Sequence, residues 1–107
     1  MRDNTFGPIT SSLKTWGGMV VLECNDGRET ARMTTYPTRM REMIFALGTK
    51  TLARLRSDAP MSLIFPTGHR VTMAASECEK LVQYLGDEMR DLFPTLSDHI
   101  EVSGRPM

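Results

Sequence analysis

Four side chains are thiols or imidazoles, the groups best suited to nucleophilic catalysis near neutral pH: Cys24, Cys78, His69 and His99. Glu77 and Glu79 flank Cys78, and their carboxylates oppose formation of the thiolate that a nucleophile requires. Cys78 also shares an apolar helical stripe with Leu81, so we expect it to be buried. Cys24 has no adjacent base, and both histidines are expected to be exposed. The pattern therefore favours no nucleophilic site.

Metal and phosphate ligands also lack their usual spacing. The cysteines and histidines form no Cys-x-x-Cys or His-x-x-x-His pair, and no calcium-binding loop occurs. The eight glycines match neither of the Gly-rich phosphate-binding fingerprints. Two cysteines do not make a disulfide framework, and we expect two reduced thiols. The sequence therefore predicts no metal ion and no cofactor.

Positive charge is concentrated in one segment. Residues 28–56 hold seven cations and two acids, although the whole chain has a net charge of zero. Such a segment attracts phosphate, and its candidate nucleic-acid contacts are Arg28, Arg32, Arg39, Lys50 and Arg54. Tyr36 and Phe45 are its only aromatic residues, which is few for a protein that stacks bases. Nucleic-acid binding is therefore the second hypothesis, and a solvated helix face is its alternative.

Four strands must position these side chains, and they are expected at residues 18–24, 28–35, 61–65 and 70–74. Val and Leu dominate the first strand. In the second, Ala31 and Met33 alternate with polar residues, which is typical of a strand with one solvated face. Asp26-Gly27 tolerates the positive φ of a tight turn, and Pro66-Thr67-Gly68 favours another turn. The strands are therefore expected to pair as two β-hairpins.

Each hairpin is followed by an amphipathic helix. Pro37 fits a first helical turn, and apolar residues recur at helical spacing over residues 38–56. Gly48 weakens this helix by about 1 kcal/mol relative to Ala, so a break there stays open. Ser76 and Glu79 have the spacing of a capping box before the second helix. The order ββα–ββα predicts an α+β fold: two hairpins form an antiparallel sheet with two amphipathic helices on one face.

The 107 residues suffice for one domain with a modest core. Residues 1–17 show no sustained periodicity and are expected to form an N-terminal arm. Residues 18–94 would form the single α+β domain, and residues 95–107 a C-terminal tail. No apolar run has the length of a signal peptide or a membrane span. We therefore expect a cytoplasmic protein that does not engage a membrane.

Phe45 and Leu52 lie outside the apolar stripe of the helix over residues 38–56. At the helical rotation of about 100° per residue, both lie roughly 100° or more away from Met40 in the core stripe. They are seven residues apart, so they form a second apolar ridge on the same helix.

Arg41 and Arg56 lie at the two ends of this ridge. Apolar centres rimmed by arginine are typical of protein interfaces, so the ridge predicts a homodimer in which it meets its own copy. Two alternatives stay open. A break at Gly48 could rotate Leu52 back into the core, or the N-terminal arm could cover the ridge with Trp16.

A second candidate surface runs along the helix that follows residue 76, beside its core stripe. It consists of Glu77, Tyr84, Glu88 and Asp91. An acidic ridge with one aromatic residue suits a basic partner, or the cations of the first helix in another subunit. The alternative is a plain solvated helix face.

These observations favour a small non-catalytic protein-binding module, such as a regulator, adaptor or inhibitor that acts by protein–protein contact. The alternative is a nucleic-acid-binding regulator that uses residues 28–56. An enzyme comes third, because an active site can be assembled from residues that are distant in sequence.

Overall fold

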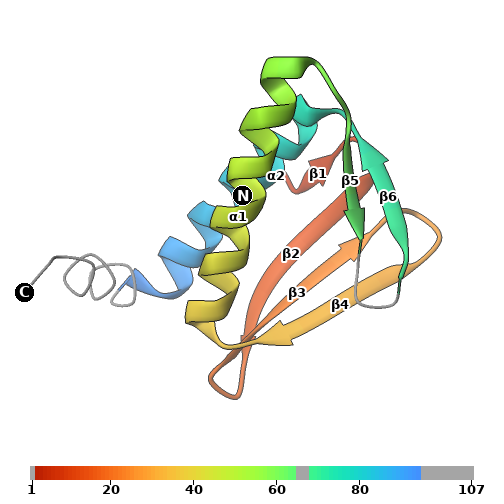
Figure 1. The fold of residues 1–107 in the computed structure, drawn as a ribbon. Coiled ribbons are helices and arrows are strands. Elements are labelled where there is room, and N and C mark those ends of the chain that lie inside the picture. Colours follow the sequence, from red (N-terminus) through yellow and green to blue (C-terminus); the bar gives the residue numbers. More distant parts are fainter. Residues whose placement is uncertain (1, 65–67, 95–107) are drawn as a thin grey trace, which may run out of the picture.

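The computed structural model describes residues 2–64 and 68–94 and shows the α+β fold that the sequence predicts (Figure 1). The elements in chain order are β1 (Thr5–Phe6), β2 (Ile9–Trp16), β3 (Met19–Asn25), β4 (Thr30–Thr35), α1 (Pro37–Ser57), β5 (Met61–Ile64), β6 (Arg70–Met73) and α2 (Ala75–Leu92). The order is therefore ββββα–ββα, with two strands more than expected at the N-terminus. The predicted tail over residues 95–107 lies outside the described residues.

The N-terminal arm predicted for residues 1–17 is wrong, because this segment belongs to the sheet. The first four strands form one antiparallel sheet in the order β1-β2-β3-β4. Strand β2 pairs with β3 from Thr10 opposite Asn25 to Trp16 opposite Met19. The chain reverses at Gly17 and Gly18, whose φ angles of 56° and 80° favour glycine.

A buried serine explains why the sequence pattern does not reveal β2. Ile9, Ser11 and Leu13 alternate with more exposed residues and are all buried. The Ser11 hydroxyl donates a hydrogen bond to the Glu23 carbonyl (3.2 Å) and lies 3.4 Å from Cys24 Sγ. Because this inward position is polar, the run Thr10-Ser11-Ser12 hides the alternation of a half-buried strand.

Strands β5 and β6 form a separate two-stranded sheet, so the two predicted hairpins do not share one sheet. His69, just before β6, links this hairpin to the β3–β4 turn. Its Nε2 lies 2.8 Å from Asp26 Oδ2, and its Nδ1 lies 3.2 Å from Glu29 Oε2. The His69 side chain is half-buried, whereas the sequence predicts an exposed one.

Both helices pack against the same side of the four-stranded sheet (Figure 1). Helix α2 contacts β1 and β2, and α1 contacts β3. The core joins inward residues of the sheet to one face of each helix, for example Ile9, Val20, Met40, Cys78, Leu81 and Leu85. The helices thereby keep their remaining faces available to solvent or to a partner.

Helix α1 is continuous from Pro37 to Ser57, so Gly48 does not break it. A Cβ added to Gly48 would lie 3.3 Å from Cγ1 of Val82 on α2. This glycine therefore allows the two helices to approach closely. The helix ends at Asp58, whose φ of 54° is left-handed.

Helix α2 begins one residue before the expected capping box. Ala75 is its first residue, Ala74 is the N-cap, and no side-chain hydrogen bond caps this end. The amides of Glu77 and Cys78 bond instead to the Ala74 carbonyl. The capping box predicted from Ser76 and Glu79 is therefore wrong, because Ser76 already lies within the first helical turn.

Candidate functional site

A groove of about 800 Å³ lies between α1 and α2. Residues every three or four positions along α1, from Arg41 to Leu52, form one wall. The other wall runs along α2 from Glu79 and ends at Phe93. Positions three and four apart share one face of a helix, so the groove follows three turns of α1.

The two helices run antiparallel along the groove. The Thr51 hydroxyl lies 3.2 Å from Cys78 Sγ, whereas Gly48 faces Val82. Residue numbers therefore rise along α1 as they fall along α2. Thr51 is fully buried, and its hydroxyl donates to the Leu47 carbonyl at 2.7 Å. The hydroxyl is thus satisfied within the floor of the groove.

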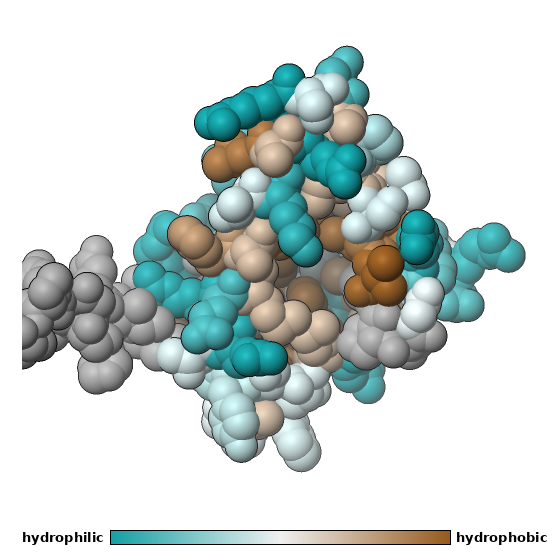
Figure 2. All heavy atoms as spheres, viewed as in Figure 1, coloured by the Kyte–Doolittle hydropathy of each residue, from teal (hydrophilic) through white to brown (hydrophobic). Residues whose placement is uncertain are grey.

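Two large apolar side chains of the α1 wall face solvent. Phe45 is 77% exposed and Leu52 is 53% exposed. In the space-filling view, hydrophobic residues reach the surface along α1 among hydrophilic ones (Figure 2). On the opposite wall a Cβ added to Gly86 would meet nothing within 4 Å. The groove therefore combines exposed apolar surface with room for close approach by another backbone.

Arg41 adds an unmet hydrogen-bond donor to this groove. Its Nη1 is buried and has no hydrogen-bond partner within residues 2–64 and 68–94. A buried donor without an acceptor costs about 1–3 kcal/mol, and a charged one costs more. Arg41 as a whole is only partly buried, so a turn of its side chain toward an acceptor on another molecule would remove this cost.

Carboxylates also line the groove. Asp87 accepts a hydrogen bond from Arg90 at 3.1 Å, so this pair is already satisfied. Glu79 is exposed, and no ion pair joins it to another residue in the described part of the chain. Among the described residues, Arg41 and Glu79 are thus a cation and an anion of the groove that no ion pair joins to another side chain.

The structure brings together Arg41, Phe45 and Leu52, three of the four residues of the predicted α1 ridge. Arg56 is exposed in the last turn of α1, beyond the groove lining. Neither alternative for the ridge holds: Leu52 is outside the core, and Trp16 is itself 72% exposed.

The α2 wall was not predicted. The sequence gives no reason to place Val82, Gly86 and Phe93 in a binding surface, and it suggests only a helix cap for Glu79. A signal for this wall does exist, because residues 79, 82, 86, 90 and 93 recur at helical spacing. Only the pairing of α1 with α2 shows that this face borders the groove.

Tyr84, predicted on the acidic ridge of α2, lies in the core instead. It is 8% exposed, and its ring centroid lies 5.3 Å from that of Phe6. Burial raises the pKa of the Tyr84 phenol, as does the charge of Glu88. The unexpected strand β1 covers this side of α2 and removes Tyr84 from the surface.

The three acids of that ridge are held within the chain. Glu77 accepts a hydrogen bond from the Gly7 amide at 3.0 Å. Arg2 lies 3.5 Å from Glu88 and 2.7 Å from Asp91. The N-terminal segment thus occupies the acidic ridge at which the sequence predicts a basic partner.

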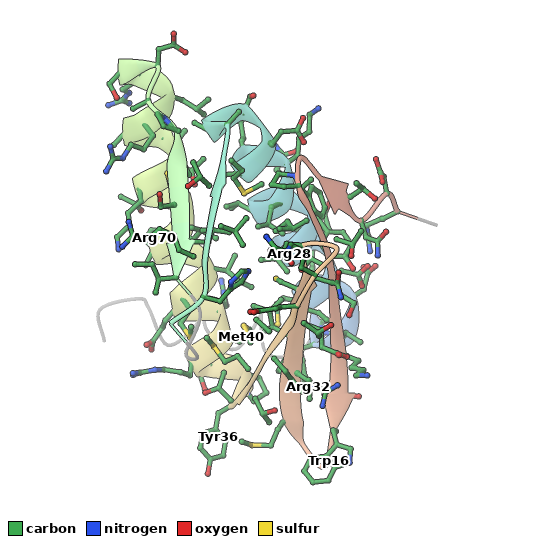
Figure 3. The ribbon with its side chains drawn as sticks, turned by 90° about the vertical axis from the view of Figure 1, so that its right-hand side faces the viewer. Trp16, Arg28, Arg32, Tyr36, Met40 and Arg70 are labelled. Carbon is green, nitrogen blue, oxygen red and sulfur yellow. The ribbon has the colours of Figure 1, made fainter. Side chains whose placement is uncertain are left out.

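The five candidate nucleic-acid contacts fall on two elements. Arg28 lies in the β3–β4 turn, Arg32 lies further along on β4, and Trp16 and Tyr36 lie at the end of the sheet opposite Arg28 (Figure 3). The other three, Arg39, Lys50 and Arg54, are exposed on α1 within an arc of about 60°. The structure therefore does not gather the set into one surface.

Arg32 is also engaged within the sheet. It lies 2.9 Å from Glu23, which Lys14 approaches to 2.8 Å. Hydrogen bonds from Lys14 and then Arg32 lower the pKa of Glu23 to about 2. This carboxylate neutralises part of the positive charge that Lys14 and Arg32 bring to the sheet.

Both cysteines are buried, as expected for Cys78, and both are free thiols. Burial raises the pKa of Cys24 and of Cys78, which disfavours the thiolate. Among the residues that the structure describes, no group of three or more His, Cys, Asp or Glu side chains could hold a metal ion. No helix in that part of the chain is long and apolar enough to cross a membrane.

Protein-family models, curated proteins and solved structures were compared with this chain. None of the three comparisons finds a match. No family is therefore assigned, and a functional hypothesis depends on the α1–α2 groove itself.

Proposed function

We propose that this chain is a small non-catalytic protein-binding module that docks its partner in the α1–α2 groove. The observation that carries this proposal is the exposure of Phe45 and Leu52 beside a groove of about 800 Å³. Aromatic and arginine side chains are enriched at the centres of protein interfaces. Arg41, with its unmet donor, supplies the second of these two groups at the same place.

Several features support this function over catalysis. Both thiols are buried, and the raised pKa of each disfavours the nucleophilic form. The described histidine, His69, faces Asp26 and Glu29 in a contact between two hairpins. That role is structural, because it ties β6 to the β3–β4 turn.

The distribution of charge supports protein binding over nucleic-acid binding. A phosphate backbone is held by cations along one continuous surface. Here the candidate cations lie on two elements, and Glu23 engages Arg32. The groove between the helices instead offers apolar side chains with charges of both signs at its rim.

The test is affinity capture with the tagged full chain from lysate of the native host, with and without nuclease. The groove variant carries Phe45→Glu and Leu52→Glu. The matched control carries Trp16→Glu and Tyr36→Glu, two exposed aromatic residues outside the groove lining. We expect a stoichiometric protein that survives nuclease, stays with the control and is lost with the groove variant.

Two outcomes would contradict the proposal. Loss of every captured protein on nuclease treatment would favour nucleic-acid binding. Capture that is equal for the wild type and the groove variant would place the docking surface elsewhere. Circular dichroism of each variant verifies that the fold is retained.

A further inference from the structure

Arg41 and Glu79, the two groove charges without an ion-pair partner in residues 2–64 and 68–94, lie near its opposite ends. Thr51 faces Cys78, so Glu79 lies close to the level of Thr51 along the helix pair. Arg41 is ten residues before Thr51, a separation of about 15 Å along the axis of α1. Arg41 and Glu79 of one chain are therefore too far apart to form an ion pair with each other.

A two-fold axis across the groove exchanges its ends. Two copies that meet face to face around such an axis run their grooves in opposite directions. Arg41 of each copy then lies over the end of the groove that carries Glu79 of the other. The symmetry makes this pairing twice, so one interface would pair both Arg41 guanidinium groups with both Glu79 carboxylates.

We propose that the occupant of the groove is a second copy of this chain, docked around this axis. This inference rests on the proposed function, since it names the partner of the same groove. The charge pattern is the reason to choose a second copy over an unrelated protein. A groove with an unmet cation at one end and an unmet anion at the other is complementary to itself.

The apolar residues fit the same arrangement. Phe45 lies one turn from Arg41, near the middle of the span between Arg41 and Thr51, so the two copies of Phe45 meet close to the axis. Leu52 lies about two turns further along, toward the end that receives Arg41 of the other copy. Gly86 leaves open space on the facing wall, which allows the helices to approach. Apolar side chains at the centre with charges at the ends are typical of a specific interface.

The first test is analytical ultracentrifugation of the full chain and of charge-reversed variants. We expect a concentration-dependent dimer for the wild type. Arg41→Glu alone and Glu79→Arg alone each place like charges together and should weaken the dimer by about ten-fold or more. The double variant restores opposite charges and should return the dissociation constant to within about three-fold of the wild type. Arg39→Glu reverses an exposed charge on the same helix outside the groove and is the matched control.

The second test is disulfide cross-linking at the axis. Phe45→Cys should give a covalent dimer under mild oxidation, because the two copies of this position meet across the axis. Ile64→Cys is the control: it is 62% exposed on β5, away from the groove, and should give little cross-linking. The native cysteines are buried and do not compete.

A wild type that stays monomeric at high micromolar concentration would overturn the inference. So would a dimer that the double charge reversal fails to restore while each single variant weakens it. If the chain is monomeric but captures a different protein through Phe45 and Leu52, the proposed function stands and only the second copy is wrong. If neither copy nor foreign protein depends on these residues, both proposals are wrong.

Discussion

Phe6 joins the N-terminal strands to α2 through a single buried ring. Its centroid lies 5.3 Å from that of Tyr84, and the next residue, Gly7, donates its amide to Glu77. Removing the ring would leave a cavity against Tyr84. We expect Phe6→Ala to lower the free energy of unfolding by about 3–5 kcal/mol, measured by urea denaturation.

Trp16 provides the matched control, because it is also an aromatic residue of the N-terminal segment but is mostly exposed. Trp16→Ala should change the free energy of unfolding by less than about 0.5 kcal/mol. Equal, small losses for both variants would mean that Phe6 does not anchor the N-terminal strands to α2.

Asp26 makes stability depend on pH in the acid range. Hydrogen bonds from the backbone amides of Glu29 and Arg28, followed by His69, lower its pKa to about 2, below the ordinary 3.8. A depressed carboxyl pKa contributes stability above the unfolded value, and this contribution is lost as the pH falls through the folded value. The loss should therefore occur between about pH 4 and pH 2, where Glu23 also titrates.

The prediction is tested by urea denaturation of Asp26→Asn from pH 7 to pH 2. Asn keeps an oxygen for the two amides but cannot titrate, so this variant should lose less stability on acidification than the wild type. Glu42→Gln, at an exposed position on α1, is the control and should follow the wild type. Parallel curves for Asp26→Asn and the wild type would exclude Asp26 from the acid transition.

At the scale of elements, α2 begins without a side-chain cap. Ala74 has the extended φ and ψ of an N-cap residue, and its side chain cannot accept a hydrogen bond. A serine there would accept one from an amide of the first turn, so Ala74→Ser should raise the free energy of unfolding by about 1 kcal/mol. Thermal melting measures this change.

Ser76→Ala is the informative partner variant. Ser76 lies inside the helix, so its loss should change stability by less than about 0.5 kcal/mol. A loss near 1 kcal/mol for Ser76→Ala, without gain for Ala74→Ser, would show that the capping box forms in solution.

The elements that the sequence predicts are those with a regular apolar period. The helix expected over residues 38–56 is Pro37–Ser57, and the strand expected over 18–24 is Met19–Asn25. Strand β2 is missed because Ser11 is polar yet buried, with its hydroxyl satisfied by the neighbouring strand. The start of α2 is missed because backbone geometry, which local side-chain chemistry does not fix, selects Ala74 as the N-cap.

At the scale of the whole molecule, half of the candidate site could be predicted. The helical period alone places Phe45 and Leu52 off the core stripe of α1, and their exposure is confirmed. The opposite wall depends on which face of α2 approaches Gly48, and this is a tertiary property. The prediction that Tyr84 lies on a surface ridge is wrong for the same reason, since it is the packing of β1 that covers this side of α2.

Stability should also be distributed unevenly over the molecule. Strand β3 lies between β2 and β4, whereas β5 and β6 form a two-stranded sheet among the strands that the structure describes. A two-stranded hairpin is marginal by itself and depends on its attachment to the rest of the fold. Here buried residues such as Met61 and Val71 anchor it from within, and His69 ties it to the β3–β4 turn. We therefore expect amides of β5 and β6 to exchange with deuterium faster than those of β3.

Removing the His69 side chain should destabilise the β5–β6 hairpin more than the four-stranded sheet. In hydrogen-exchange mass spectrometry, His69→Ala should speed exchange in β5 and β6 more than in β2 and β3, because the contacts to Asp26 and Glu29 join the hairpin to the larger sheet. Arg70→Ala changes the exposed next residue, the first of β6, and should leave exchange close to the wild type. Uniformly faster exchange in His69→Ala would mean that the two sheets open as one cooperative unit. The β5–β6 hairpin would then be as stable as the four-stranded sheet.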